Sequence, residues 1–307
     1  MTRISDTRER FETALTELVT DVREDPNILA AILCGSLSHD EVWDKSDIDL
    51  VLISIDDKKM SVRHIALVKD DINIHTSIMT RGDFRRELEA ATRNTFEHSL
   101  FAKATLLYSE DPSIDKLFAG LTVLGERDQQ VQQMIAGAHA LGPLYKAKKW
   151  WEIKSDLDYA ALWLLYTATA IAQLELGAAG RIVAREVLPE ASELNPELFK
   201  VIYTDLLNRK KTRKAVGAAL ETIEQYLLDR TERLFAPILE YLKMAGDPRS
   251  VTEIHAYFTR NYGFSEALIA CEWLSDMGFI EKASTPVKLT VKSRVDIEEL
   301  AFYNPDF

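Results

Sequence analysis

The sequence has little cysteine, little positive charge and no long apolar run, and each shortage excludes a class of protein. Its two cysteines, Cys34 and Cys271, lie far apart in apolar segments, which predicts buried thiols rather than a disulfide framework or a cysteine metal site. The longest apolar stretch, residues 159–174, is shorter than the ~20 residues of a membrane-spanning helix. The N-terminal segment also lacks the apolar core of a signal peptide. We therefore expect a cytoplasmic protein without a membrane partner.

Positive charge is scarce, because 37 Lys and Arg stand against 49 Asp and Glu and give a formal net charge of -12. An acidic surface repels nucleic-acid backbones and anionic lipids. Nucleic acid is therefore an unlikely partner, although a local basic patch would escape this argument. The length of 307 residues and the 47% hydrophobic content are typical of a soluble chain with two or three globular domains.

The N-terminal part carries the pattern of an α+β domain. Its expected elements are an amphipathic helix over residues 11–22, strands over residues 28–34, 47–55 and 72–79, and a helix that begins near Phe84. The first strand is a continuous apolar run that stops at Gly35, whereas the third alternates apolar and polar residues. Strands separated by helices indicate a sheet with helices packed against it.

Helical spacing replaces the strand patterns over residues 123–245. Aromatic and apolar residues recur there at intervals that favour an antiparallel bundle. We expect one stripe of this pattern to lie in the core: Trp150, Tyr159, Leu162, Trp163 and Tyr166.

The segment Gly246-Asp247-Pro248 predicts a linker to a third domain. A capped helix, a second helix over residues 265–277 and a hairpin formed by residues 279–282 and 287–291 are expected to follow, in the order of a winged helix. The second helix holds three acids and no basic residue, so we expect this module to pack against the chain or bind protein rather than DNA.

The candidate site lies between the first two strands. Gly35 and Ser36 end the first strand, and Ser46, Asp47 and Asp49 open the second after a polar spacer. Alternate side chains of a strand share a face, so the two carboxylates can bind the same hard cation. Backbone N–H groups in a glycine turn can hold phosphate oxygens. The pattern therefore predicts a nucleoside triphosphate bound with two Mg²⁺ ions for phosphoryl transfer.

This pattern resembles the signature of the DNA polymerase beta-like nucleotidyltransferase superfamily, which is Gly-Ser, a spacer, and Asp-x-Asp at the start of a strand. The matching positions are Gly35, Ser36, Asp47 and Asp49, with Ser46 also fitting small-molecule members. A catalytic domain followed by a bundle is similar to antibiotic nucleotidyltransferases of the kanamycin and streptomycin type. The resemblance implies transfer of a nucleoside monophosphate, usually AMP, from a nucleoside triphosphate to a small-molecule hydroxyl.

The sequence patterns together predict the domain order. We expect a mixed-sheet nucleotidyltransferase domain over residues 1–122, an all-α bundle that binds substrate over residues 123–245, and a winged helix over residues 246–307. The chain as a whole would then be of the α+β class. The sequence leaves room for a homodimer but does not fix the oligomeric state.

One position departs from the family pattern. The family places a third acid on a later strand, where this sequence has Asn73, which can ligate a metal but cannot accept a proton. Asp71 and His75 share its face, so Asp71 is a candidate metal ligand and His75 a candidate general base. Alternatively, the protein is a nucleotide-binding regulator with a weakened site, or an enzyme that acts on a protein or an RNA.

The expected bundle offers further candidates. In the antibiotic-modifying relatives it can supply a carboxylate base, for which Glu152, Asp156 and Asp158 are available, although solvated or capping roles are favoured for each. Arg181 and Arg185 are four residues apart and would share a helix face from which they could contact the triphosphate, with a surface charge pair as the alternative.

Overall fold

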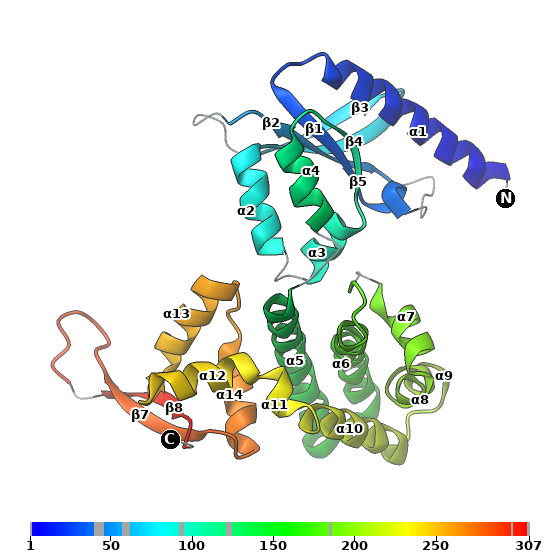
Figure 1. Ribbon diagram of the computed structural model, residues 1–307. Coiled ribbons are helices and arrows are strands. Elements are labelled where there is room, and N and C mark those ends of the chain that lie inside the picture. The colour runs from blue at the N-terminus through cyan, green and yellow to red at the C-terminus, as the bar shows by residue number, and fades with distance from the viewer. Residues whose placement is uncertain are drawn as a thin grey trace. The chain divides into compact units, whose positions relative to one another are not determined.

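A computed structural model shows two compact units, Met1–Leu124 and Gly125–Phe307 (Figure 1). The structure describes residues 2–39, 46–56, 62–91, 95–120, 125–183, 186–295 and 297–305. The two later domains expected from the sequence fall together in the second unit, so a separate third domain stays a prediction. No helix within the described ranges combines the length and apolarity needed to cross a bilayer.

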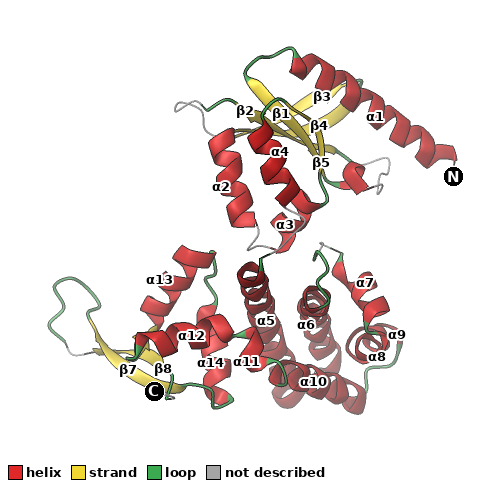
Figure 2. Ribbon diagram, in the orientation of Figure 1, coloured by secondary structure: helices red, strands yellow, loops and turns green. Residues whose placement is uncertain are grey.

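The first unit is a mixed five-stranded sheet with helices on both faces (Figure 2). Its helices are α1 (Thr2–Arg23), α2 (Arg81–Ala91), α3 (Thr95–Ala102) and α4 (Pro112–Ala119). Its strands are β1 (Ile28–Cys34), β2 (Ile48–Ser54), β3 (Arg63–Lys69), β4 (Ile72–Thr80) and β5 (Thr105–Ser109). The strand order is β3-β4-β2-β1-β5, with β2 and β4 parallel and the other neighbours antiparallel. The expected α+β class is confirmed.

Two separate cores fix the sheet because alternate residues of each strand face opposite sides. Leu50 and its like-facing neighbours pack beneath α1, where Phe11 and Leu15 are buried. Val51 and the residues on its face pack against α2, α3 and α4, where Phe84 is fully buried. The start of β2 is therefore held between two cores, which positions the acidic residues found there.

Strands β3 and β5 were not predicted from the sequence. β3 lies at the sheet edge and buries none of its residues fully, so its apolar alternation is weak. A tight turn joins it to β4, and Asp70 and Asp71 in this turn have positive φ angles of 49° and 58°. β3 and β4 therefore form a hairpin, which apolar periodicity alone does not predict because β3 is mostly exposed and the turn is polar.

The second unit is mainly helical. Its helices are α5 (Glu126–Lys149), α6 (Leu157–Ala178), α7 (Val187–Leu194), α8 (Pro196–Phe199), α9 (Asp205–Asn208), α10 (Arg213–Leu228), α11 (Thr231–Leu234), α12 (Ala236–Ala245), α13 (Val251–Tyr262) and α14 (Ala267–Asp276), with π-helical segments at Trp150–Lys154 and Lys200–Thr204. Its strands are β6 (Arg249–Ser250), β7 (Glu281–Val287) and β8 (Ile297–Tyr303), in the order β6-β8-β7. As expected, the described residues from 125 to 245 contain no strand.

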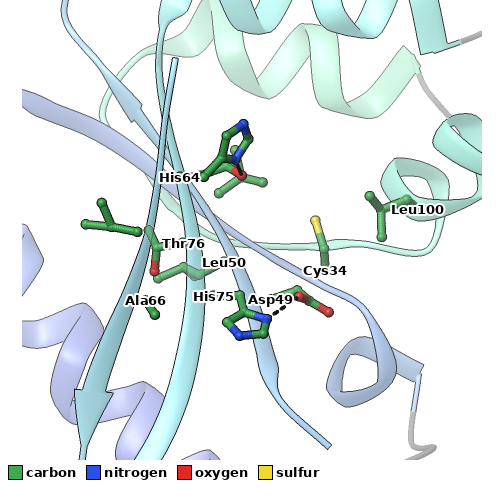
Figure 3. A pocket seen from close by; sticks show the side chains of 11 residues that line it. Cys34, Asp49, Leu50, His64, Ala66, His75, Thr76 and Leu100 are labelled. Atoms are coloured by element: carbon green, nitrogen blue, oxygen red, sulfur yellow. Dashed lines mark hydrogen bonds and ion pairs between the residues drawn. The ribbon is translucent and has the colours of Figure 1, made fainter. Parts of the chain in front are cut away.

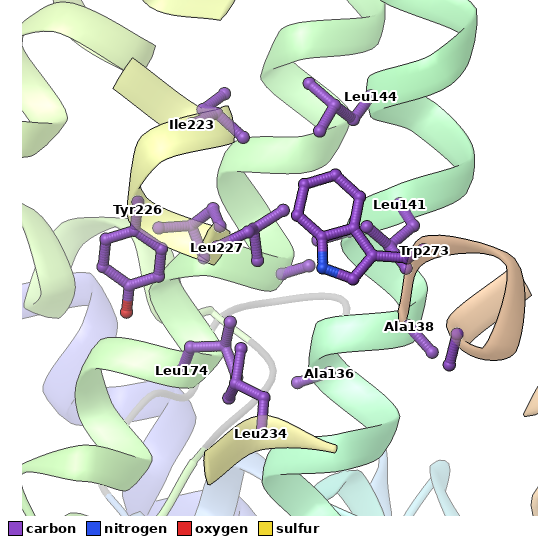
Figure 4. Close-up of a cluster of buried hydrophobic side chains, with 14 of the residues drawn as sticks. Ala136, Ala138, Leu141, Leu144, Leu174, Ile223, Tyr226, Leu227, Leu234 and Trp273 are labelled. Carbon is purple, nitrogen blue, oxygen red and sulfur yellow. The ribbon is translucent and has the colours of Figure 1, made fainter. Parts of the chain in front are cut away.

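One core joins the bundle to the C-terminal helices. Trp273 of α14 packs with Leu141 and Leu144 of α5 (Figure 4). Its indole N–H donates a buried hydrogen bond of 2.9 Å to the Thr231 hydroxyl. Cys271 is fully buried in the same core. The expected buried role of the second C-terminal helix is confirmed at Trp273.

Two expectations for this unit were wrong. The second strand of the hairpin is β8 rather than residues 287–291, because Ala301 and Phe302 supply the buried side chains, whereas Val291 is exposed. The aromatic stripe is not wholly in the core, since Tyr159 and Tyr166 are 39% and 56% exposed. Helical spacing gave the correct helix there but not the width of its buried face.

Candidate active site

The acidic residues lie at the beginning of β2, the central strand of the sheet. Asp47 directly precedes the strand, and Asp49 is its second residue. In the strand register, Asp49 is level with Cys34 of β1 on one side and with His75 of β4 on the other. The titratable side chains of Cys34, Asp49 and His75 therefore form a row across the neighbouring strands β1, β2 and β4.

The two carboxylates converge on the His75 ring. Nδ1 of His75 lies 3.9 Å from Oδ2 of Asp47 and 4.0 Å from Oδ1 of Asp49. Figure 3 shows the Asp49 and His75 side chains turned toward each other, with Cys34 beside Asp49. Asp47, Asp49 and His75 form a triad, and about half of each side chain is exposed, at 44%, 49% and 56% respectively. The carboxylates are thus accessible to a ligand from solvent.

The electrostatics of the site disfavour ionised Asp49. Burial is the main cause of the raised pKa of Asp49, the nearby Asp47 charge raises it further, and His75 acts in the opposite direction. Within the described parts of the chain, no Lys or Arg lies at ion-pair distance from either carboxylate. Burial, with the Asp49 charge second, raises the pKa of Cys34 to about 12, so its thiol stays protonated at neutral pH.

Gly35 is required by the position of the Asp49 carboxylate. Its φ angle is +70°, and a β-carbon built on it would collide with the carboxylate oxygen Oδ2 of Asp49. The following 3₁₀ turn, Ser36–His39, is fixed by Ser38, whose N–H and hydroxyl donate to the Gly35 carbonyl at 3.1 and 2.7 Å. The backbone at Gly35 is therefore packed directly against one of the two carboxylates.

Three other residues predicted for the site, Ser46, Asp71 and Asn73, lie near the beginnings of β2 and β4. Asn73 is exposed on β4 and precedes the pairing of Ile74 with Ile48, so it is level with Asp47. Ser46 is half-buried and directly precedes Asp47. Asp71 lies exposed in the turn before β4. Arg185 and the side chain of Ser36 lie outside the described residues.

Sequence reasoning missed a polar pair beside the triad. His64 of β3 is directly opposite Ser77 of β4, and Nδ1 of His64 lies 2.9 Å from the Ser77 hydroxyl. Both residues line a pocket of about 470 Å³ that Cys34, Asp49 and His75 also line. The Asp70-Asp71 turn was the available sequence signal, because recognising it would have placed β3 beside β4.

Two of the candidates from the second unit, Asp156 and Arg181, have structural partners. Asp156 caps α6 by accepting a hydrogen bond of 2.9 Å from the Tyr159 N–H, in line with the capping alternative. Arg181 does not lie on a helix, because α6 ends at Ala178, and its guanidinium pairs with Glu190 at 2.8 Å. The predicted shared helix face with Arg185 was therefore wrong.

The donor set suits a magnesium ion that is completed by its substrate. Among the described residues, no group of three or more His, Cys, Asp or Glu side chains is arranged to hold a metal ion by itself. Mg²⁺ commonly takes one or two carboxylates and fills its other positions with water and nucleotide phosphates. Asp47 and Asp49 fit that role, since a cation would offset the burial and repulsion that raise the pKa of Asp49.

Comparison with known proteins shows a family match for the first unit and a similar fold in one solved structure. Residues 17–113 match the family model described as "Polymerase beta, Nucleotidyltransferase". The crystal structure of a nucleotidyltransferase-like protein from Exiguobacterium sibiricum is similar in fold, with a TM-score of 0.68 over 96% of this chain and 99% of that chain at 14% sequence identity. None of the curated proteins matches the sequence.

Proposed function

Because residues 17–113 form a nucleotidyltransferase domain of the polymerase beta-like superfamily, we propose that the protein transfers a nucleoside monophosphate to a hydroxyl group of a small molecule. The donor in this proposal is a nucleoside triphosphate, ATP before GTP, and the reaction requires Mg²⁺. The convergence of Asp47 and Asp49 over the Gly35 backbone is the observation that carries the proposal.

The carboxylates supply the metal side of the site. Asp47 and Asp49 would hold Mg²⁺, which, when bound, neutralises triphosphate charge and lowers the pKa of an attacking hydroxyl. Backbone N–H groups at the turn that begins with Gly35 and Ser36 would hold phosphate oxygens. Cys34 does not suit the role of general base, because burial and the Asp49 charge raise the pKa of its thiol to about 12.

His75 is the proposed general base. Its Nδ1 faces both carboxylates, which favours a proton on that nitrogen and leaves Nε2 to accept one. Nε2 would take the proton of the acceptor hydroxyl as its oxygen attacks the α-phosphorus. The new O–P bond forms while the bond to the β-phosphate oxygen breaks, and pyrophosphate leaves. This role makes an acid at Asn73 unnecessary for proton removal.

A nucleotide-binding regulator is the second candidate, and Asn73 is the observation that favours it. The amide is level with Asp47, where a carboxylate would add a third anionic metal ligand. A protein that binds nucleotide without turnover would gain transfer activity on Asn73→Asp substitution. An enzyme that relies on His75 would already be active and would change only modestly.

The proposal is tested with ATP or GTP labelled at the α-phosphate, Mg²⁺ and a panel of hydroxylated small molecules that includes aminoglycosides. We expect label to move to at least one acceptor, with release of pyrophosphate and with loss of transfer in Asp47→Asn and Asp49→Asn. Clear nucleotide binding without label transfer under any condition would contradict the enzyme and favour the regulator.

A further inference from the structure

Most lining residues of the pocket beside the triad belong to β4 and β3, and Cys34 at the end of β1 closes its other end. Its lining runs from Cys34 and Asp49 across β4 to His64 and Ala66 of β3 (Figure 3). The strand order puts β1 on one side of β2, and puts β4 and then β3 on the other. Since Gly35 directly follows Cys34, the turn at Gly35 lies on the β1 side of the carboxylates, at one end of the pocket, and His64 and Ser77 lie on the opposite side at its other end.

This placement assigns the two substrates to different sides. In phosphoryl transfer the attacking and leaving oxygens are roughly in line across the phosphorus. If the Gly35 turn holds the departing phosphates, the attacking hydroxyl must come from above β4 and β3. We propose, on the basis of the proposed function, that the pocket binds the acceptor, and that His64 and Ser77 determine its specificity.

The pocket lining indicates the chemical class of this acceptor. A volume of about 470 Å³ is within the usual range for a small-molecule site. Val51, Ala66 and Leu100 give it an apolar wall, and the hydrogen-bonded pair His64 and Ser77 gives it one polar end. The acceptor is therefore a small alcohol with an apolar body and one further hydrogen-bonding group.

A polyhydroxylated sugar does not suit this lining. Several of its hydroxyl groups would face Val51 and Leu100 without hydrogen-bond partners, and unpaired polar groups weaken binding. The proposed acceptor instead directs its reacting hydroxyl toward His75. Its other polar group meets His64 and Ser77, which lie further along the same face of β3 and β4 because alternate strand residues share a face.

The first test separates nucleotide from acceptor through equilibrium binding of Mg–ATP by calorimetry. His64→Leu and Ser77→Val are expected to change the Kd for Mg–ATP by less than about twofold, whereas Gly35→Ala raises it about tenfold. His255→Leu and Thr222→Val in the second unit are matched controls. If the His64 and Ser77 variants weaken Mg–ATP binding as much as Gly35→Ala does, the pocket holds nucleotide and the inference is overturned.

The second test compares two acceptors with the same carbon ring, cyclohexanol and inositol, with α-labelled ATP and Mg²⁺. We expect cyclohexanol to be labelled at the lower KM, and His64→Leu and Ser77→Val to raise the KM of an acceptor that reaches the polar end, such as 4-hydroxycyclohexanol, about tenfold. A preference for inositol, or no transfer to any of these alcohols by a protein that binds Mg–ATP, overturns the inference. Absence of Mg–ATP binding by the unsubstituted protein contradicts the proposed function as well.

Discussion

Two groups of carboxylates lie at opposite ends of β2, and the folded chain treats them differently. At the beginning of the strand, Asp47 and Asp49 both lie near Nδ1 of His75, at 3.9 and 4.0 Å. Beyond its end, Asp56 shares the Arg81 guanidinium with Asp111, which pairs with Nη1 at 2.8 Å while Asp56 pairs with Nη2 at 2.7 Å. The first group is open to a cation, and the second already has one.

The pKa directions express the same contrast. The Gly82 N–H and then Arg81 hold the pKa of Asp56 below its ordinary value. Arg81, followed by Ser113, lowers the pKa of Asp111 to about 2. Burial moves the pKa of Asp49 the other way. Ionised carboxylates are therefore stabilised by the chain at one end of β2, and at the other end they are left to be stabilised by a ligand.

The largest expected effect that tests this contrast is on catalysis. Asp49→Asn should lower the rate of nucleotidyl transfer about 1000-fold, because the site loses one of the two carboxylates that would hold the charge-neutralising Mg²⁺. It should not lower the free energy of unfolding at pH 7, since a raised native pKa means that ionised Asp49 opposes folding there. Label transfer and urea unfolding measure the two quantities.

Asp56→Asn is the matched control for Asp49→Asn. It should leave the transfer rate within about twofold and lower stability, because it weakens the interactions with Arg81 and the Gly82 N–H. Equal losses of transfer in both variants would show that the two ends of β2 do not differ in function.

A smaller loss is expected for the proposed base. His75→Gln should lower kcat about 100-fold while the Kd of Mg–ATP changes by less than about threefold, because general-base catalysis commonly contributes that much. His255→Gln is the control, since His255 is an exposed histidine of α13 whose Nδ1 lies 3.1 Å from the Ser265 carbonyl oxygen, which can only accept. A change confined to the KM for the nucleotide would remove the general-base role from His75.

Glycine substitutions sharpen the comparison further. Gly35→Ala and Gly180→Ala both force a side chain into φ of +70°, which costs about 1 kcal/mol of stability. At Gly180 nothing lies within 4 Å of the new β-carbon, whereas at Gly35 it meets the Asp49 carboxylate. We therefore expect Gly35→Ala to lose more stability than Gly180→Ala, and about tenfold weaker Mg–ATP binding for Gly35→Ala alone. Normal binding by Gly35→Ala would argue against close packing of this backbone on the site.

The smallest expected effect is the loss of stability on substitution of Asp111, which pairs with Arg81. Asp111 also caps α4 by accepting from the Ser113 N–H at 2.8 Å, so Asp111→Ala should lower the free energy of unfolding by about 1 kcal/mol at pH 7. A lowered native pKa gives stability that is complete above the unfolded value of 3.8 and is lost as the pH falls toward about 2. The difference between Asp111→Ala and the unsubstituted protein should therefore shrink below pH 3.8. A difference that grows on acidification would contradict this sign.

The strongest sequence signals correctly predicted three of the five strands of the first unit, β1, β2 and β4. β1 is a continuous apolar run, and β4 alternates strictly, so both were predicted, as was the shared face of Asp47 and Asp49. β3 was missed because Ile65 and Leu67 are only half-buried at the sheet edge. The pairing of His64 with Ser77 depends on that strand and could not be predicted without it.

Contacts between segments that are distant in the sequence could not be predicted either. Asp56, Arg81 and Asp111 are separated by more than twenty residues in sequence, and only the packing of α2 and α4 beside the end of β2 brings them together. The 287–291 segment is as apolar as a strand but remains exposed, because the hairpin core is filled by Phe302 instead. Local pattern predicts the type of an element, whereas its partner is decided by the whole core.

Calorimetric titration with ATP, in the presence of Mg²⁺ and then of excess EDTA, tests the central contrast most directly. The unsubstituted protein and Asp56→Asn should bind ATP in Mg²⁺ with similar Kd values, and Asp47→Asn should bind at least about tenfold more weakly. EDTA should weaken binding by the first two proteins to the level of Asp47→Asn. Equal, metal-independent binding by all three proteins would contradict the account.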